Sequence, residues 1–187
     1  MPQIIRALLV LSLLTASLAW ADDYDDTIKV FKDAGESGKF FEKAYGYAVF
    51  PTIGKGGFVI GGAYGKGRVY AGGKHVGDTS MTQVTIGAQL GGEAYRQIIF
   101  FEDKRAFDEF TSGEFEFGVQ AQAVAITAGA SATAGTGGTS AGASTSSKDA
   151  KTVGGSYTKG MAVFTVAKGG LMYEASIGGQ KFSYEPR

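Results

Sequence analysis

The chain has 187 residues, with 18 basic and 18 acidic side chains, 30 glycines, one histidine and no cysteine. Disulfides, thiol nucleophiles, cysteine zinc sites and multi-histidine metal sites are excluded, because each needs residues that the chain lacks. The balanced charge argues against nucleic-acid binding, which would show a strong basic excess. The length suits one domain, and 44% hydrophobic residues can form its core.

The first 21 residues have the order of a secretory signal peptide. Arg6 precedes an apolar run over residues 7–18, and Ala19-Trp20-Ala21 forms an A-x-A cleavage site. An uncleaved anchor is the alternative, but the apolar run is shorter than the roughly 20 residues that a spanning helix needs. We therefore expect residues 22–187 to be exported to the periplasm, with the extracellular space as the alternative destination.

The mature chain predicts short helices and many strands. Helices are expected over residues 22–34, 37–44 and 104–110, the last capped by Asp103 and stopped by Gly113. Residues 45–50 alternate as a strand that Pro51 should end. A strand over 57–65 should turn at Gly65-Lys66-Gly67 and return over 68–72. Further strands are expected over residues 81–91, 94–101, 115–121, 152–167, 171–178 and 181–184.

These elements predict a β-rich α+β domain. We expect a strongly twisted antiparallel sheet, or a closed barrel-like one, with two or three short helices. The strand at 57–65 has one bulky face and one nearly bare face, so another backbone or layer can approach it closely. Residues 128–147 are all Ala, Gly, Ser or Thr, which predicts a flexible loop, with a tightly packed Gly/Ala strand as the alternative.

No convincing catalytic or cofactor motif is present. The glycine runs at 54–57 and 65–67 lack the third glycine of G-x-G-x-x-G and follow a strand period, so a nucleotide site is rejected. His75 sits among glycines, where an exposed loop histidine is favoured over a catalytic one. The paired acids mostly flank a helix rich in basic residues, as on a solvated face. Glu93 and Arg96 are interpreted as a structural ion pair. We expect no enzyme activity, no metal and no cofactor.

Several ordered blocks of the chain resemble the SYLF-domain family of lipid-binding proteins. A first block is an apolar strand ending in Phe-Pro, followed by a Lys-x-Gly-Phe strand and a Gly-Gly-x-Tyr-Gly-x-Gly pattern. A second block has the pattern Gly-x-Gln-x-Gly-x-Glu with an apolar continuation. The matching segments are residues 45–51, 55–67, 86–93, 95–101, 112–113 and 157–160, within a likeness that covers roughly residues 31–184.

The resemblance implies a single β-rich domain that binds phosphoinositides or other anionic lipids. Fungal and animal members of that family also contact actin and the membrane-trafficking machinery. In eukaryotic relatives an amphipathic helix before the sheet engages membranes, whereas this chain has Asp22, Asp23, Asp25 and Asp26 there, which an anionic bilayer repels. Because the first 21 residues favour export, we carry over lipid or membrane-surface binding and not actin.

The expected headgroup site is a set of four bases beside glycine turns. Lys55, Lys66, Arg68 and Lys74 lie in a stretch, from Lys43 to Gly77, that has no acidic residue. Adjacent hairpin tips would gather these bases around a phosphate, at about 1 kcal/mol for each base. The alternative is that they only keep exposed hairpins soluble. The aromatic residues expected to insert into the membrane beside them are Phe58, Tyr64 and Tyr70.

Two other classes of function stay open. Evenly spaced alternating strands in an exported chain also suit a small outer-membrane β-barrel or a surface structural protein. Residues 94–101 argue against the barrel, because they are almost continuously apolar rather than alternating, and the chain ends in Glu185-Pro186-Arg187 instead of an aromatic strand. An enzyme with an internal pocket is the third candidate. We therefore expect an exported, non-enzymatic lipid-binding protein.

Overall fold

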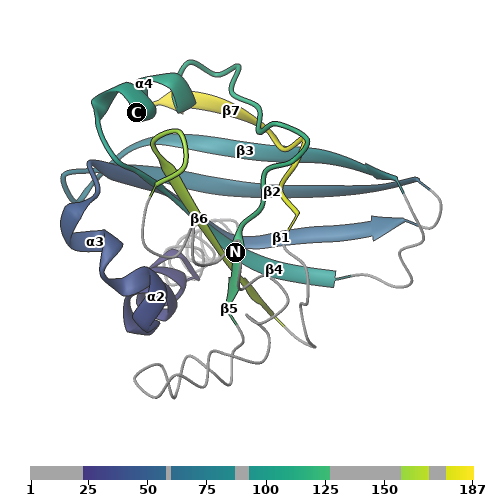
Figure 1. Cartoon of the computed structure of the whole chain (residues 1–187), viewed down its shortest axis with the longest axis horizontal. Coiled ribbons are helices and arrows are strands. Elements are labelled where there is room, and N and C mark those ends of the chain that lie inside the picture. The colour runs from purple at the N-terminus through teal and green to yellow at the C-terminus, as the bar shows by residue number, and fades with distance from the viewer. Residues whose placement is uncertain (1–22, 58–59, 87–92, 127–156, 169–175) are drawn as a thin grey trace, which may run out of the picture.

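The computed structural model describes residues 23–57, 60–86, 93–126, 157–168 and 176–187. The expected signal peptide, the 128–147 tract and Phe58 lie outside these ranges. Within them, no helix is long and apolar enough to cross a bilayer. The described part of the chain forms a twisted sheet with short helices at its periphery (Figure 1).

The helices lie close to their predicted positions, but the one expected over 37–44 is divided in two. Residues 23–33 are helical, and the chain continues through α2 (Gly35–Gly38) and α3 (Phe40–Lys43). The third expected helix is α4 (Lys104–Phe110). Its N-cap is Asp103, whose carboxylate accepts a hydrogen bond of 2.9 Å from the backbone N–H of Ala106. Gly113, the expected stop, has a φ of +86° that favours glycine.

Seven strands form one mixed sheet in the order β5-β6-β4-β1-β2-β3-β7. Their bounds are β1 Gly46–Gly57, β2 Ile60–Ala71, β3 Lys74–Ile86, β4 Glu93–Phe101, β5 Val124–Ile126, β6 Met161–Ala167 and β7 Lys181–Pro186. The β5–β6 pair is parallel, and the other five pairs are antiparallel. The expected β-rich fold is confirmed, and its sheet is open rather than closed.

Two predicted strand ends are wrong. Strand β1 continues through Pro51, because the pairing registers with both β2 and β4 shift beside it, and a proline is tolerated at such a bulge. Strand β2 continues through Gly65-Lys66-Gly67: all three residues pair with β3, and Gly65 and Lys66 also pair with β1. The real turn is at Gly72-Gly73, with φ of +58° and +77°. The predicted turn at 65–67 therefore does not exist.

The segment after α4 also differs from the prediction. In place of a long strand over 115–121, it forms isolated bridges, Glu116 with Lys181 and Gln122 with Ser176, before the short β5 begins. The segment cannot keep a continuous ladder, because it starts beside β7 and ends paired with β6 at the other edge of the sheet. It runs from β7, one edge of the sheet, to β5, the other edge, and Val119 at its middle is 87% exposed.

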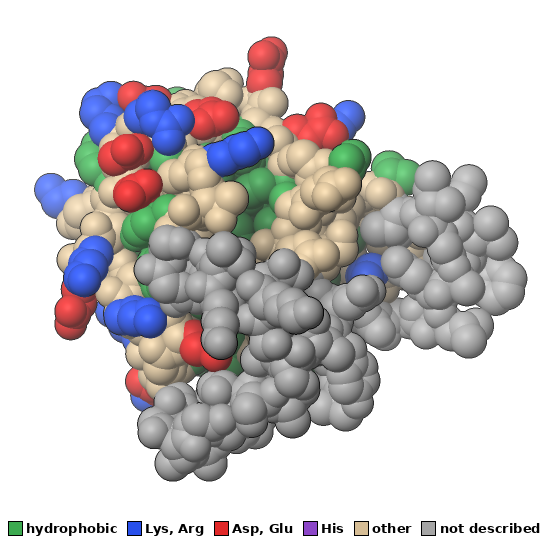
Figure 2. Space-filling view, in the orientation of Figure 1, with side chains coloured by type: hydrophobic (Ala, Val, Ile, Leu, Met, Phe, Trp, Pro, Cys, Tyr) green, Lys and Arg blue, Asp and Glu red, His purple; other side chains and the backbone are tan. Residues whose placement is uncertain are grey.

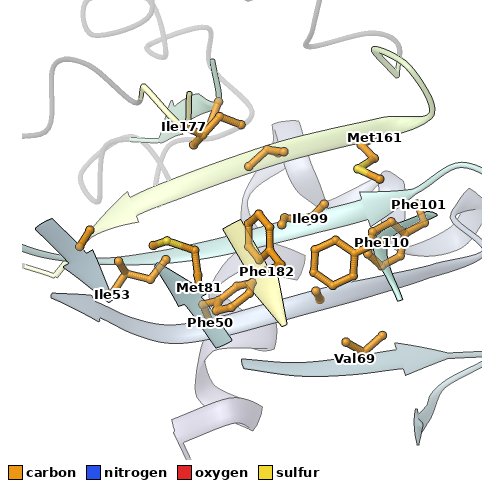
Figure 3. Packing of buried hydrophobic residues seen from close by; sticks show 14 of the residues in the cluster. Phe50, Ile53, Val69, Met81, Ile99, Phe101, Phe110, Met161, Ile177 and Phe182 are labelled. Carbon is orange, nitrogen blue, oxygen red and sulfur yellow. The ribbon is translucent and has the colours of Figure 1, made fainter. Parts of the chain in front are cut away.

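The sheet has two buried faces. The inner face carries one cluster that includes Phe50, Ile99 and Phe182, with Phe110 of α4 packed on Phe182 at 4.9 Å between ring centroids (Figure 3). The side of β2 that carries Gly65 and Gly67 faces this inner cluster. A Cβ on Gly65 would come within 2.7 Å of the Ile53 side chain, and one on Gly67 within 2.7 Å of the Phe50 ring, so side chains of the neighbouring strand β1 lie closely over this side. The outer face carries the second cluster, in which Phe40 of α3 packs on β4 and β6.

A polar group is buried within the inner face. Gln97 and Gln180 exchange hydrogen bonds of 2.9 and 3.1 Å between their side-chain amides, and Gln180 also donates to the Tyr95 hydroxyl at 3.2 Å. Each amide thereby satisfies the other, as a buried polar pair requires. Burial raises the pKa of Tyr95 to about 12.

Candidate functional site

The four predicted bases do not form one cluster. Directly opposite residues of antiparallel strands share a face, and Lys55 pairs with Ala63, whose side chain belongs to the inner core. Lys66 pairs with the exposed Thr52, which places it on the outer face. Lys74 pairs with Ala71 at the hairpin end of β2, eight residues along that strand from Ala63. Lys55 and Lys74 therefore lie beside opposite ends of β2. Both pair with β2 residues that belong to the opposite face of the sheet from Lys66.

Arg68 shares the outer face with Lys66 but is already engaged. Its guanidinium carbon lies 4.1 Å from the ring centroid of Tyr24, a cation–π contact with the helix of residues 23–33. Asp78 is its cross-strand partner on β3. Burial raises the pKa of Tyr24, and the positive charge of Arg68 partly opposes that rise. Arg68 thus helps to attach the helix to the sheet.

The structure places two other bases beside Lys66. The Lys168 ammonium, just after β6, donates a hydrogen bond of 2.7 Å to the Thr52 hydroxyl. Arg96 lies on β4 between residues that pair with Phe50 and Ile53, and so flanks Thr52 from the side opposite Lys66. Strands lie about 4.8 Å apart, so the backbones of Lys66 and Arg96 are about 10 Å apart. We call Lys66, Arg96 and Lys168 the basic patch.

The basic patch has no acidic partner within the described ranges. None of its three side chains forms an ion pair there, and the four ion pairs found involve other residues. The Nε atom of Arg96 is buried and has no hydrogen-bond partner among the described residues. A buried unpaired donor is costly, and an anion bound at the patch would remove that cost. The Glu93 side chain, the expected partner of Arg96, lies outside the described part of the structure.

Apolar side chains lie next to the basic patch on the outer face. Tyr64, two residues before Lys66 on β2, is 51% exposed, and Val84 on β3 is 75% exposed. They are diagonal neighbours, because Tyr64 pairs with Thr82 and Val84 pairs with Gly62. Lys181 of β7 is exposed and pairs with Thr82 on the same face, which adds a further base beside the three of the basic patch. A cationic area therefore borders a tyrosine and an aliphatic side chain.

Tyr70 does not have the exposed position that the sequence suggested. Its ring stacks on Tyr47, with centroids 5.1 Å apart and an interplanar angle of 19°. Tyr47 belongs to the set packed against the outer-face core, and burial raises its pKa to about 12. Of the three predicted aromatic contacts, Tyr64 is exposed, Tyr70 is committed to packing and Phe58 lies outside the described residues.

His75 is not an exposed loop histidine. Its side chain is 15% exposed, and its Nε2 lies 2.8 Å from an Asp78 carboxylate oxygen. Its Nδ1 lies 2.6 Å from the guanidinium of Arg187, which can only donate. Both ring nitrogens are therefore occupied by structural partners, which leaves neither one available as a general base. The sequence missed this arrangement because Arg187 is 112 residues away.

Elsewhere on the surface, opposite charges are mixed. Around α4, Lys104 pairs with Asp108 at 2.6 Å and Arg105 with Glu109 at 3.6 Å, each one helical turn apart. Figure 2 shows basic and acidic side chains interspersed over this part of the molecule. These exposed pairs resemble an ordinary solvated surface. The bases of the basic patch differ from these residues, because they form no ion pair within the described ranges.

The sequence contained only weak signals for the basic patch. Lys168 lies 116 residues from Thr52, and nothing local to it indicates that it contacts β1. Arg96 stands out in the sequence as a charge within an apolar strand, which pointed to a buried ion pair. Only the order of the strands brings β2, β1, β4 and β6 side by side and gathers the three bases.

The sequence also matches known proteins. Residues 82–185 match the family model described as Ysc84, Las17-binding protein actin regulator. A protein of Aeromonas veronii named Beta cell expansion factor A is 32% identical over 157 residues, which cover 83% of this chain and 51% of that protein. The chain thus spans about half the length of this curated relative. The chain belongs to the Ysc84 family, also called the SYLF-domain family, and the resemblance seen in its sequence is confirmed.

Proposed function

We propose that this member of the Ysc84 family binds the surface of anionic membranes through its basic patch, with Tyr64 and Val84 entering the interfacial region. The observation that carries the proposal is the group of three unpaired bases from β2, β4 and the end of β6 around Thr52. Bases near an anionic surface contribute about 1 kcal/mol each, so three of them supply about 3 kcal/mol.

The chemistry of Arg96 favours a phosphate-bearing ligand. A guanidinium presents several donors in a plane that matches phosphate oxygens, and it binds them more strongly than neutral acceptors. The unpartnered Nε of Arg96 would gain an acceptor, and Lys66 and Lys168 would add charge from either side. Tyr64 suits the adjoining interface, because tyrosine combines an apolar ring with a polar hydroxyl.

The compartment follows from the N-terminal segment. Residues 1–21 carry the pattern of a signal peptide, so the membrane in question is one that faces the periplasm or the outside of the cell. The family description names an actin regulator, but we do not extend that role to this chain, because an exported protein does not meet cytosolic actin. We propose a non-enzymatic role, since the sequence has no convincing catalytic motif and both ring nitrogens of its one histidine are engaged by Asp78 and Arg187.

Co-sedimentation with vesicles tests the proposal. Phosphatidylcholine vesicles with and without phosphatidylglycerol are compared for the wild type, a Lys66→Glu, Lys168→Glu variant, and a control Lys43→Glu, Lys74→Glu variant. The control changes the net charge equally, but its two exposed lysines lie outside the basic patch. We expect the wild type and the control to bind the anionic vesicles, and the patch variant to bind at least thirtyfold more weakly.

Salt provides a second measurement. The binding should weaken steeply between 0.1 and 1 M salt, as the screening length falls from ~10 Å to ~3 Å. Equal losses in the two double variants would show that only net charge matters and would refute the basic patch. Binding of equal strength to vesicles without phosphatidylglycerol would refute anionic recognition altogether.

A further inference from the structure

A cleft of about 790 Å³ opens on a different part of the molecule from the basic patch. It lies between the crossing segment of residues 115–122, the end of α4, the turn before β6 and Ile177. Cavities of roughly 300–1,000 Å³ are typical of sites for small organic ligands. The cleft forms where the open sheet leaves the inner core without a covering strand, because the crossing segment makes only isolated bridges there.

The floor of the cleft is apolar. Met161, Val163 and Ile177 are 5%, 4% and 2% exposed and belong to the inner core. Figure 3 shows Ile177 and Met161 at well-separated places in this core. The half-buried Phe115, Phe117 and Ala121 of the crossing segment pack against the same core and complete the lining. A ligand that lies here must present an extended apolar part.

The rim carries a lysine in an uncommon conformation. Lys159 has a φ of +52° and Gly160 a φ of +81°, in a tight turn closed by hydrogen bonds between Thr158 and Met161. Asn, Asp or Gly is preferred at the first of these positions, so a lysine there carries backbone strain. A Cβ on Gly160 would lie 2.9 Å from both Ala106 and the Arg105 side chain, so the turn is packed closely on α4.

Lys159 is also the cation that suits an anionic group at the rim. Its side chain is exposed and forms no ion pair within the described ranges. Among the described residues that line the cleft, two are acidic: Glu109, which is paired with Arg105 at 3.6 Å, and the exposed Glu116. Thr158, Gln120 and Gln122 add neutral hydrogen-bonding groups.

We propose that the cleft binds a single-chain anionic amphiphile of the fatty-acid class, with its aliphatic chain along the apolar floor and its carboxylate beside Lys159. The apolar floor selects the chain, and the unpaired ammonium selects the sign of the head group. A long-chain fatty acid is comparable in size to the ligands that cavities of this volume hold. This site is separate from the basic patch, and the inference does not depend on membrane binding.

The test uses a fluorescent fatty acid, 11-dansylaminoundecanoic acid, below its micelle concentration and without vesicles. We expect saturable binding of one probe per chain, with a blue-shifted emission, and displacement by palmitate but not by the uncharged hexadecanol. Ala121→Trp, which fills the cleft, should weaken probe binding at least tenfold. Circular dichroism and the midpoint of thermal unfolding check that this variant is folded.

Lys159→Gly separates a binding role from a structural one. Glycine relieves the backbone strain at this position, so the variant should unfold at a higher temperature and yet bind the probe at least fivefold more weakly. The control Lys168→Glu should leave probe binding unchanged while it weakens vesicle binding. Absence of saturable binding by the wild type, or equal affinity of the wild type, Ala121→Trp and Lys159→Gly, would overturn the proposal. Equal displacement by palmitate and hexadecanol would refute the role of Lys159.

Discussion

Replacement of Gly67 by alanine should destabilise the fold, although a strand usually gains stability from that exchange. A Cβ at Gly67 would lie 2.7 Å from two ring carbons of Phe50 and 2.8 Å from the carbonyl oxygen of Val49. The Phe50 ring is fully buried, and the carbonyl belongs to the neighbouring strand. Neither can move without shifting β1 against β2. Overpacking of this kind costs about 1–3 kcal/mol of the free energy of unfolding.

Gly54→Ala is the matched control, because a Cβ on Gly54 meets nothing within 4 Å. That substitution restricts the unfolded chain and should be neutral or stabilise by up to about 1 kcal/mol. Thermal and urea unfolding of the two variants measure the difference. For a domain of this size, about 1–3 kcal/mol corresponds to a lower Tm by roughly 2–12 °C. If Gly67→Ala is as stable as Gly54→Ala, the close approach of Phe50 does not constrain β2.

Three further outcomes are expected. Asp103→Ala removes the N-cap of α4 and should lower the free energy of unfolding, measured by urea titration, by about 0.5–2 kcal/mol. Asp103→Asn should lower it much less, because asparagine can also accept the capping hydrogen bond. In the neutral imidazole of His75 the proton should reside on Nε2, because Arg187 donates to Nδ1, and nitrogen-15 NMR that finds it on Nδ1 would contradict this geometry. The pKa of Tyr95 is raised to about 12 by burial, while an unfolded tyrosine ionises near 10, so its contribution to stability should be complete below pH ~10 and lost toward pH 12. Unfolding midpoints across that pH range test this loss, and Tyr95→Phe should reduce it.

Much of the architecture followed from local patterns. The helix at 104–110 was predictable because Asp103 and its apolar face act within one or two turns of chain. The strand at 94–101 was predictable from a continuous apolar run, which suits a central strand buried on both faces. The bare side of β2 was visible in the alternation of glycine with bulky residues. All of these signals lie within about a dozen residues.

The predictions were wrong where one local sequence pattern is compatible with more than one backbone structure. Glycine permits a turn at 65–67 but also permits close packing inside a strand, and contact with Phe50 and Ile53 selects the second. Pro51 ends many strands but is accepted at a bulge, and only pairing on both sides creates that bulge. In both cases the deciding partner lies on another strand.

The family, the β-rich fold class and the scarcity of groups for metal or thiol chemistry could be read from the amino-acid sequence, because composition and ordered motifs are properties of the chain. Which bases lie together depends on how the strands pair. Lys55 and Lys74 are close to Lys66 in sequence. They are nevertheless separated from it, because their partners lie at the two ends of β2 and on the opposite face of the sheet from Lys66. Arg96 and Lys168, distant in sequence, reach Thr52 because β4 and β6 follow β1 in the sheet. Side-chain direction in a strand alternates with every residue and strand order is set by long-range pairing, so neither is encoded in the spacing of charges along the chain.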